Sequence, residues 1–206
     1  MNMGLNSKIS AWNRMNIKDI WHSIQCEVEI IHISVPSSDI QIEYKLKTSR
    51  DTVIESMRNC IDYCRDKCTE VTIGMEDSSR ADFKFLLEII SAAAAEGVKR
   101  FRYADTVGIL FRQRILDEIR LLKANKDIEL EIHAHNDLGM AVANSISAAM
   151  GGAEYVDCTV GGIGERTGNC DFIHFITSAR ECMNMFKDYD MEHLKHKQEN
   201  ILKIIN

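Results

Sequence analysis

Two histidines separated by one residue are the strongest chemical signal in the chain. His133 and His135 lie in the run EIHAHND, which follows apolar residues typical of a strand. In a strand, residues two apart point to the same face with Cα atoms about 6.6 Å apart, so both imidazoles can bind one ion at about 2.0–2.1 Å. Strand-end histidines can instead simply hydrogen-bond to neighbours. Because Asn136 and Asp137 follow directly, we favour a metal site.

A glycine-rich segment is the second signal. The run GGIGERTGN covers residues 161–169. Glycines let the backbone approach a ligand, and successive N–H groups can bind an anion. The alternative is a tight turn between a strand and a helix.

Strand and helix patterns alternate along the chain and would position these residues. Strands are expected at 8–12, 28–35, 70–74, 99–106, 128–133 and 155–160, and helices at 17–24, 50–68, 81–97, 111–123, 138–151, 172–186 and 191–205. A polar loop is expected between Pro36 and the helix at 50. The strands are short and β-branched, which is typical of parallel strands buried on both faces.

An open doubly wound sheet and a (β/α)₈ barrel both fit this alternation. No G-x-G-x-x-G follows the first strand, so the dinucleotide-binding form of the open sheet lacks its signature. A barrel builds its active face at the carboxyl ends of its strands. Polar residues follow nearly every expected strand: Arg14; Ser34 and Ser37; Glu76 and Asp77; Asp105 and Thr106; His133, His135, Asn136 and Asp137; Glu165, Arg166 and Asn169. We therefore expect an α/β chain with a TIM-type (β/α) barrel, incomplete at about six of eight βα units.

The composition excludes several classes of protein. The 206 residues carry 25 Lys and Arg against 31 Asp and Glu, a net charge of −6, with 45% hydrophobic residues. These values are typical of a globular domain and give no basic run for nucleic acid. No apolar stretch reaches the roughly 18 residues of a membrane span, and the N-terminus has no signal-peptide pattern. Seven cysteines without an export signal favour the cytoplasm.

Three of these cysteines, Cys60, Cys64 and Cys68, recur every four residues on one expected helix face. A metal or iron–sulfur site is one interpretation. One straight helix face cannot surround a tetrahedral metal, so we favour packing of a half-buried helix.

The run HAHNDLGMAVANSISAAMGGAEYVDCTVGGIGERTGN resembles the signature of the Claisen-condensing family of homocitrate, isopropylmalate and citramalate synthases, with HMG-CoA lyase as a cousin. The segments ISAWNRM, ISVPSSDIQIEYKL, EDSSRADFKFLLEII and FRYADTVGIL resemble the homocitrate synthases of nitrogen fixation. The resemblance implies a (β/α)₈ barrel that condenses acetyl-CoA with 2-oxoglutarate, giving homocitrate and CoA. That homocitrate would serve the nitrogenase iron–molybdenum cofactor.

The resemblance also implies roles for five residues. His133 and His135 match the paired ligands of a divalent ion (Mg²⁺, Mn²⁺ or Zn²⁺), and Asn169 matches a position that lies at the metal. Thr106 matches the threonine that hydrogen-bonds the carboxylate of the 2-oxo acid. Glu76 matches an active-site carboxylate that handles protons.

Two departures from the family qualify this assignment. Lysine-pathway homocitrate synthases grip the distal carboxylate of 2-oxoglutarate with an arginine and a serine, where this chain has Thr72 and Gly74. Arg14 or a partner chain would then bind the distal carboxylate. The family's first strand, DTTLRDGEQ, which brings a metal-binding aspartate, and its second strand are also missing.

We therefore expect residues 1–188 to form a partial catalytic barrel with family strands 3–8, and 189–206 to form a helix leading toward a missing lid domain. A companion subunit would supply the DTTLRDGEQ-like strand and the lid, and without it the chain would self-associate, for example as a homo-oligomer. A truncated sequence is the alternative to a split enzyme. A non-catalytic scaffold or regulatory subunit, a related isopropylmalate or citramalate synthase and a CoA-thioester lyase are the alternative functions.

Overall fold

The computed structural model describes residues 6–67, 70–124 and 127–205. The chain divides into two compact units, each described by itself. The first comprises Met1–Ala104 with Asp127–Glu129, and the second Asp105–Lys126 with Leu130–Asn206. The predicted boundary at residue 188 stays a prediction.

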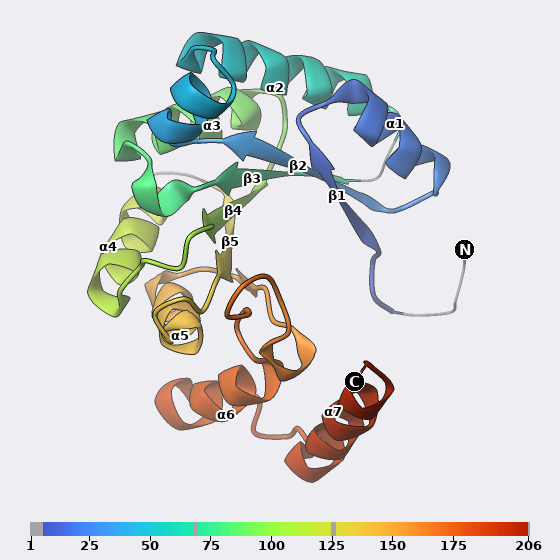
Figure 1. Ribbon diagram of the computed structural model, residues 1–206, viewed down its shortest axis with the longest axis vertical. Coiled ribbons are helices and arrows are strands. Elements are labelled where there is room, and N and C mark those ends of the chain that lie inside the picture. The colour runs from blue at the N-terminus through green and yellow to red at the C-terminus, as the bar shows by residue number, and fades with distance from the viewer. Residues whose placement is uncertain (1–5, 68–69, 125–126, 206) are drawn as a thin grey trace. The chain divides into compact units, whose positions relative to one another are not determined.

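In the first unit, strands alternate with helices and pair in parallel in the order β1-β2-β3-β4 (Figure 1). Its elements are β1 (Ser10–Arg14), α1 (Ile17–Gln25), β2 (Ile30–Pro36), the π-helix η1 (Ile40–Lys45), α2 (Arg50–Cys64), β3 (Glu70–Glu76), the 3₁₀ turn η2 (Ser78–Arg80), α3 (Phe83–Ala95) and β4 (Arg100–Asp105). Every residue of β2 except Pro36 is buried. Both faces of this strand are therefore covered, as the apolar run predicts.

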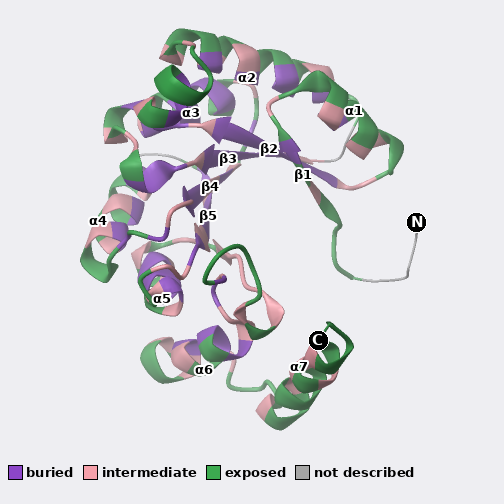
Figure 2. Cartoon of the chain, viewed as in Figure 1, coloured by how far each residue is buried: buried purple, intermediate pink, exposed green. Residues whose placement is uncertain are grey.

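Polar caps set the starts of the helices in this unit. The side chain of Asn16 accepts a hydrogen bond from the N–H of Lys18, and Asp82 accepts one from Lys84. Both helices have a buried side, which includes Ile20 of α1 and Phe85 of α3, and an exposed side (Figure 2). Capping and the apolar stripe together place each helix against the strand that precedes it.

The second unit holds α4 (Arg112–Lys123), β5 (Glu129–Ala134), α5 (Ala141–Gly151), β6 (Tyr155–Val156), the 3₁₀ turn η3 (Val160–Gly162), α6 (Phe172–Met183) and α7 (Met191–Ile205). β5 and β6 pair in parallel, with Glu131 opposite Tyr155. α4 packs closely on α5, because a Cβ on Gly151 would lie 3.1 Å from the Ile119 side chain. The predicted α/β class is confirmed.

α7 lies on the glycine-rich segment of this unit. The Gln198 side chain accepts a hydrogen bond from the N–H of Gly161 at 3.1 Å. A Cβ on Gly161 would lie only 2.9 Å from Leu202, and the φ of this residue is +65°. Only glycine therefore suits this contact.

Several predictions for these elements are wrong, among them the helix ends at 68 and 138, where α2 ends at Cys64 and α5 begins at Ala141. Three more have a clear local reason. The expected polar loop after Pro36 contains the π-helix η1. The last strand ends at Val156 rather than residue 160, because the next residues form a turn in which Gly161 and Gly162 have positive φ. The helix from Phe172 ends at Met183, because Asn184 adopts the left-handed conformation at its C-terminus.

The cysteine stripe behaves as a packing face in the part that is described. Cys60 and Cys64 of α2 are 4% and 1% exposed, which fits packing rather than a metal site. Cys68 lies outside the described residues.

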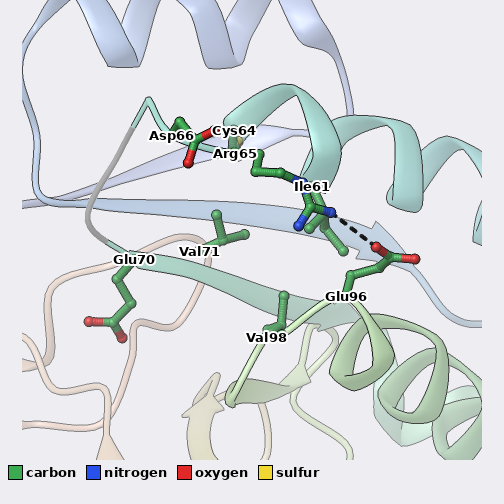
Figure 3. A pocket seen from close by; sticks show the side chains of 9 residues that line it. Ile61, Cys64, Arg65, Asp66, Glu70, Val71, Glu96 and Val98 are labelled. Carbon is green, nitrogen blue, oxygen red and sulfur yellow. Dashed lines mark hydrogen bonds and ion pairs between the residues drawn. The ribbon is translucent and has the colours of Figure 1, made fainter.

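A small pocket of about 150 Å³ lies beside Cys64, between the end of α2 and the start of β3 (Figure 3). The Arg65 and Glu96 side chains form an ion pair at its edge, at 3.2 Å. It lies at the amino end of β3, whereas Glu76 is at the carboxyl end. The amino-terminal ends of barrel strands serve stability rather than chemistry.

None of the helices in the described ranges combines the length and the hydropathy needed to cross a membrane.

Candidate functional site

The two predicted metal-binding histidines lie side by side at the carboxyl end of β5. Their Nε2 atoms are 3.2 Å apart, and the ring planes are nearly perpendicular at 88°. The Nδ1 atom of His133 lies 3.2 Å from a carboxylate oxygen of Asp157. A carboxylate in this position fixes the orientation of a metal-binding imidazole.

Asn169 is the third residue of this cluster. A β-bridge joins it to His135, and the N–H of Asn136 donates to the carbonyl of Gly168 at 2.9 Å. The amide nitrogen of Asn169 donates to the Ile163 carbonyl at 3.2 Å, but its Oδ1 is buried without a hydrogen-bond partner. The Nδ1 atom of His135 is likewise buried without a partner. Buried polar atoms normally have partners, so this cluster has unused acceptor capacity.

These donors fit a divalent ion. The cluster offers imidazole nitrogens from His133 and His135 and an amide oxygen from Asn169, groups that bind metals of the Mn²⁺ to Zn²⁺ series. Among the residues that the structure describes, no group of three or more His, Cys, Asp or Glu side chains forms a metal site. A carboxylate ligand from elsewhere would strengthen this donor set.

Burial lowers the pKa of His135, and the nearby charges of His133 and Arg166 lower it further. The neutral imidazole is the form that binds a metal. His135 therefore stays available for a metal at a lower pH than an ordinary histidine.

Arg166 connects three loops next to this cluster. Its Nε and Nη2 atoms donate to the two carboxylate oxygens of Asp137 at 2.8 and 2.9 Å, and Nη2 also donates to the carbonyl of Thr106 at 2.8 Å. The hydrogen bonds lower the pKa of Asp137 and raise that of Arg166. The sequence places Arg166 after a strand but indicates no role for it, because its partners come from distant segments.

Thr106 lies in a turn that packs against Asp137. The buried carboxylate of Asp105 accepts hydrogen bonds from the N–H groups of Ile109 and Leu110, at 3.1 and 3.0 Å. Gly108 has a φ of +63°, and a Cβ there would lie 2.5 Å from an Asp137 carboxylate oxygen. The turn carrying Thr106 therefore contacts the loop that follows His135.

Thr106, His133, His135 and Asn169 thus all belong to the second unit, whereas Glu76 belongs to the first. Glu76 accepts hydrogen bonds from Ser34 Oγ at 3.2 Å and Gln41 Nε2 at 2.6 Å. The Nζ atom of Lys45 lies 3.7 Å away.

Gln41 and Lys45 were not found from the sequence. Both lie on η1, and π-helices occur often at functional sites. The sequence here is polar and has no α-helical period that would have revealed them.

The positions that departed from the family also have a structural explanation. The Nδ1 atom of His32 lies 2.8 Å from the hydroxyl of Thr72, and both residues are buried. A Cβ on Gly74 would lie 2.3 Å from Nε2 of the same imidazole. His32 therefore fills the space that a serine at position 74 would need.

Arg14 is already engaged in an ion pair. Its Nε and Nη2 atoms donate to the carboxylate of Asp19 at 2.6 and 3.0 Å. This pairing is a reason against using Arg14 to grip a substrate carboxylate.

Comparison with known proteins places this arrangement in a family. A family model described as HMGL-like matches residues 1–201. The chain belongs to the HMGL-like family. This HMGL-like chain is 47% identical to the homocitrate synthase subunit alpha of Clostridium pasteurianum over 205 residues, which are 98% of the chain and 76% of that protein.

Other relatives of this HMGL-like chain are longer. Homocitrate synthase 1 of Nostoc sp. is 42% identical over 82% of the chain and 45% of that protein. The 2-isopropylmalate synthase 2 of Caldanaerobacter subterraneus is 36% identical over 97% of the chain and 52% of that protein. The chain spans about half the length of these two relatives.

Solved structures agree on the fold. HMG-CoA lyase from Pseudomonas aeruginosa has a TM-score of 0.82 at 16% identity. The match covers 97% of the HMGL-like chain and 70% of the lyase chain. HMG-CoA lyase from Bacillus subtilis has a TM-score of 0.80 at 14% identity, over 94% and 69%. At such low identity the likeness shows the fold alone. The HMGL-like chain is a partial α/β barrel of the TIM type, with β1 to β4 paired in parallel in one unit and β5 paired in parallel with β6 in the other.

Proposed function

We propose that the chain is a subunit of a homocitrate synthase, which condenses acetyl-CoA with 2-oxoglutarate to give homocitrate and CoA. The observation that carries the proposal is 47% identity over 98% of the chain to a protein named homocitrate synthase subunit alpha. The donor cluster of His133, His135 and Asn169 supports it, because the three side chains suit a divalent ion (Mg²⁺, Mn²⁺ or Zn²⁺). The product would serve as the organic ligand of the nitrogenase iron–molybdenum cofactor.

Each residue of the site has a separate role in this proposal. A bound divalent ion would act as a Lewis acid toward a 2-oxo acid. His133, His135 and Asn169 hold that ion, and Asp157 orients His133. Thr106 donates a hydrogen bond to the carboxylate of the 2-oxo acid.

Arg166 and Glu76 complete this assignment. Arg166 keeps the Thr106 turn in place by binding its carbonyl. Glu76, positioned by Ser34 and Gln41, handles the proton that acetyl-CoA loses when its methyl carbon becomes the nucleophile.

A companion subunit belongs to this proposal. Two imidazoles and one amide bind a hard divalent ion weakly without a carboxylate. A second chain with the DTTLRDGEQ-like strand would add that carboxylate, and it would also bring the lid. The subunit name of the Clostridium relative supports such a division between chains.

The test is reconstitution. The chain is purified alone and together with a companion bearing the DTTLRDGEQ-like strand, and CoA release from acetyl-CoA is followed with a thiol reagent. We expect 2-oxoglutarate-dependent release only from the mixture, with homocitrate identified by mass spectrometry. The His133→Ala variant mixed with the same companion is the matched inactive control.

Two other outcomes would replace the proposal. Because relatives at 32–36% identity are named isopropylmalate and citramalate synthases, 3-methyl-2-oxobutanoate and pyruvate are assayed in parallel. Turnover of either in place of 2-oxoglutarate would reassign the substrate. If no acceptor is turned over, the result would support a scaffold or regulatory subunit. Turnover by the chain alone would contradict the need for a companion.

A further inference from the structure

Two thiols face each other at the base of the glycine-rich segment. The Sγ atoms of Cys158 and Cys170 are 3.7 Å apart. Between them lies the loop of residues 159–169, which ends in Asn169, a member of the donor cluster.

The backbone holds these two cysteines in register. The N–H of Thr159 donates to the Cys170 carbonyl at 2.9 Å, and the N–H of Phe172 donates to the Thr159 carbonyl at 3.0 Å. A parallel bridge pairs Thr159 with Asp171. Cys158 and Cys170 are the preceding residues of the two segments, so they lie opposite each other at a strand spacing of about 4.8 Å. Disulfides form between Cα atoms about 4.4–6.8 Å apart.

The two thiols differ in exposure. Cys158 is partly exposed, whereas Cys170 is fully buried with 0% exposure. A small oxidant can therefore reach the pair from the side of Cys158, and the second thiol of the pair can resolve the product.

We propose that Cys158 and Cys170 form a reversible disulfide when a peroxide is present. Hydrogen peroxide first oxidises one of the two thiols to a sulfenic acid with release of water. The sulfur of the other cysteine then attacks this sulfur, the S–S bond forms, and a second water leaves. One peroxide is reduced to two waters, and the two thiols lose two protons and two electrons. A dithiol reverses the step by thiol–disulfide exchange.

The bond would change the donor cluster. An S–S bond is about 2.0 Å long, so the two sulfurs must approach from 3.7 Å. Cys170 directly follows Asn169, whose amide oxygen must keep its place to bind an ion. This part of the inference rests on the proposed metal site, and it predicts weaker metal binding in the oxidised chain.

The test begins with a thiol count. The reduced chain has seven cysteines, and one disulfide leaves five of them open to alkylation. The chain is treated with stoichiometric hydrogen peroxide, quenched with an alkylating reagent and digested, and the linked peptide is sought by mass spectrometry. We expect a Cys158–Cys170 peptide that disappears after dithiothreitol.

Matched variants separate this pair from the exposed thiols. Cys158→Ser and Cys170→Ser should each abolish the linked peptide. The double variant Cys26→Ser/Cys182→Ser removes two exposed cysteines and should form the linked peptide as the wild type does. Oxidation of Cys26 and Cys182 without a linked peptide in the wild type would overturn the proposal.

Metal binding provides the second measurement. Calorimetry with Mn²⁺ is expected to show about tenfold weaker binding after oxidation. Dithiothreitol should restore the original affinity, and peroxide should not change the affinity of Cys158→Ser. An unchanged affinity in a chain that carries the disulfide would overturn the switch. If the reduced chain binds no Mn²⁺ at all, the proposed metal site fails, while the linked peptide still decides whether the disulfide forms.

Discussion

Arg166 holds two neighbouring loops of the candidate site through its side chain. It adopts a positive φ of +54° and still binds both carboxylate oxygens of Asp137 and the carbonyl of Thr106. A non-glycine residue in this conformation costs of order 1–3 kcal/mol. The three hydrogen bonds hold Arg166 in this conformation beside the donor cluster.

The metal assignment is tested at His133 and His135. Each His→Ala variant removes one ligand, so Mn²⁺ affinity measured by calorimetry should fall by about tenfold or more. His174→Ala is the matched control, because this exposed histidine lies on α6 outside the cluster. Unchanged binding in both site variants would remove the metal from His133 and His135.

Thr106 is tested through the substrate. Loss of one hydrogen bond to a charged group costs about 1.5–3 kcal/mol, so Thr106→Val should raise the KM for the 2-oxo acid in the reconstituted enzyme. Metal affinity and the unfolding transition should stay as in the wild type. Thr106→Ser, which keeps the hydroxyl, is the control that should retain the wild-type KM.

The pair of Arg166 and Asp137 is tested by a double-mutant cycle. Arg166→Gln, Asp137→Asn and the double variant are unfolded with urea. We expect a coupling free energy of about 1 kcal/mol, because the arginine side chain is 41% exposed and solvent weakens the attraction. Additive effects would mean that the pair contributes nothing to loop stability.

At the scale of elements, Arg50 ties together the starts of three helices. Its guanidinium binds Asp39, which precedes η1, and Asp82, which caps α3. It also lies 4.9 Å from the centre of the Phe85 ring. The N–H of Lys84, and then Arg50, lower the pKa of Asp82.

This lowered pKa predicts a pH dependence of stability. A carboxyl group with a folded pKa below its unfolded value of about 3.9 stabilises the fold fully above the unfolded pKa. That contribution is lost as the pH falls through the folded pKa. Asp82→Asn keeps a capping oxygen but removes the charge, so its unfolding free energy should fall less between pH 7 and acid pH than that of the wild type.

Urea unfolding across this range gives the measurement. Asp188→Asn, at an exposed position, is the control and should follow the wild-type curve. A curve for Asp82→Asn that overlays the wild type would contradict the role of the charge.

Elements with a clear hydrophobic period were predictable from the sequence, and those set by distant contacts were not. The apolar runs of β2 and β3 and the stripe of α3 fall where their patterns place them. The π-helix η1 was missed because its hydrogen bonds run from residue i to i+5, a spacing with no matching side-chain pattern.

The candidate site divides in the same way. His133 and His135 are predicted by their spacing and Asn169 by its resemblance to the family, and the structure brings the three together. Arg166 and Gln41 depend on loops and on a π-helix that meet their partners only after folding. No spacing in the sequence could connect them.

At the scale of the whole molecule, β1 presents an unpaired edge in the described ranges, because it pairs only with β2. Trp12 on this strand is 59% exposed. Exposed strand edges promote association with other chains. The chain purified alone should therefore self-associate in a concentration-dependent way, measured by sedimentation velocity.

Trp12→Lys should shift that equilibrium toward monomer, because a charged edge residue opposes strand pairing. Tyr44→Lys is the control, since Tyr44 is more exposed at 77% but lies on η1. Addition of the companion subunit should dissociate the self-associated species. A wild-type chain that stays monomeric at all concentrations would contradict this use of the edge.

The π-helix η1 has a consequence for how this segment tolerates change over evolution. A π-helical turn contains more residues than an α-helical turn. Deleting one residue from Ile40–Lys45 would leave too few residues for its hydrogen bonds from residue i to i+5 and would change the separation of Gln41 and Lys45 along the turn. Gln41 and Lys45 would no longer meet at Glu76. The length of this segment is therefore under stronger selection than its composition, so substitutions should outnumber gaps here among related sequences.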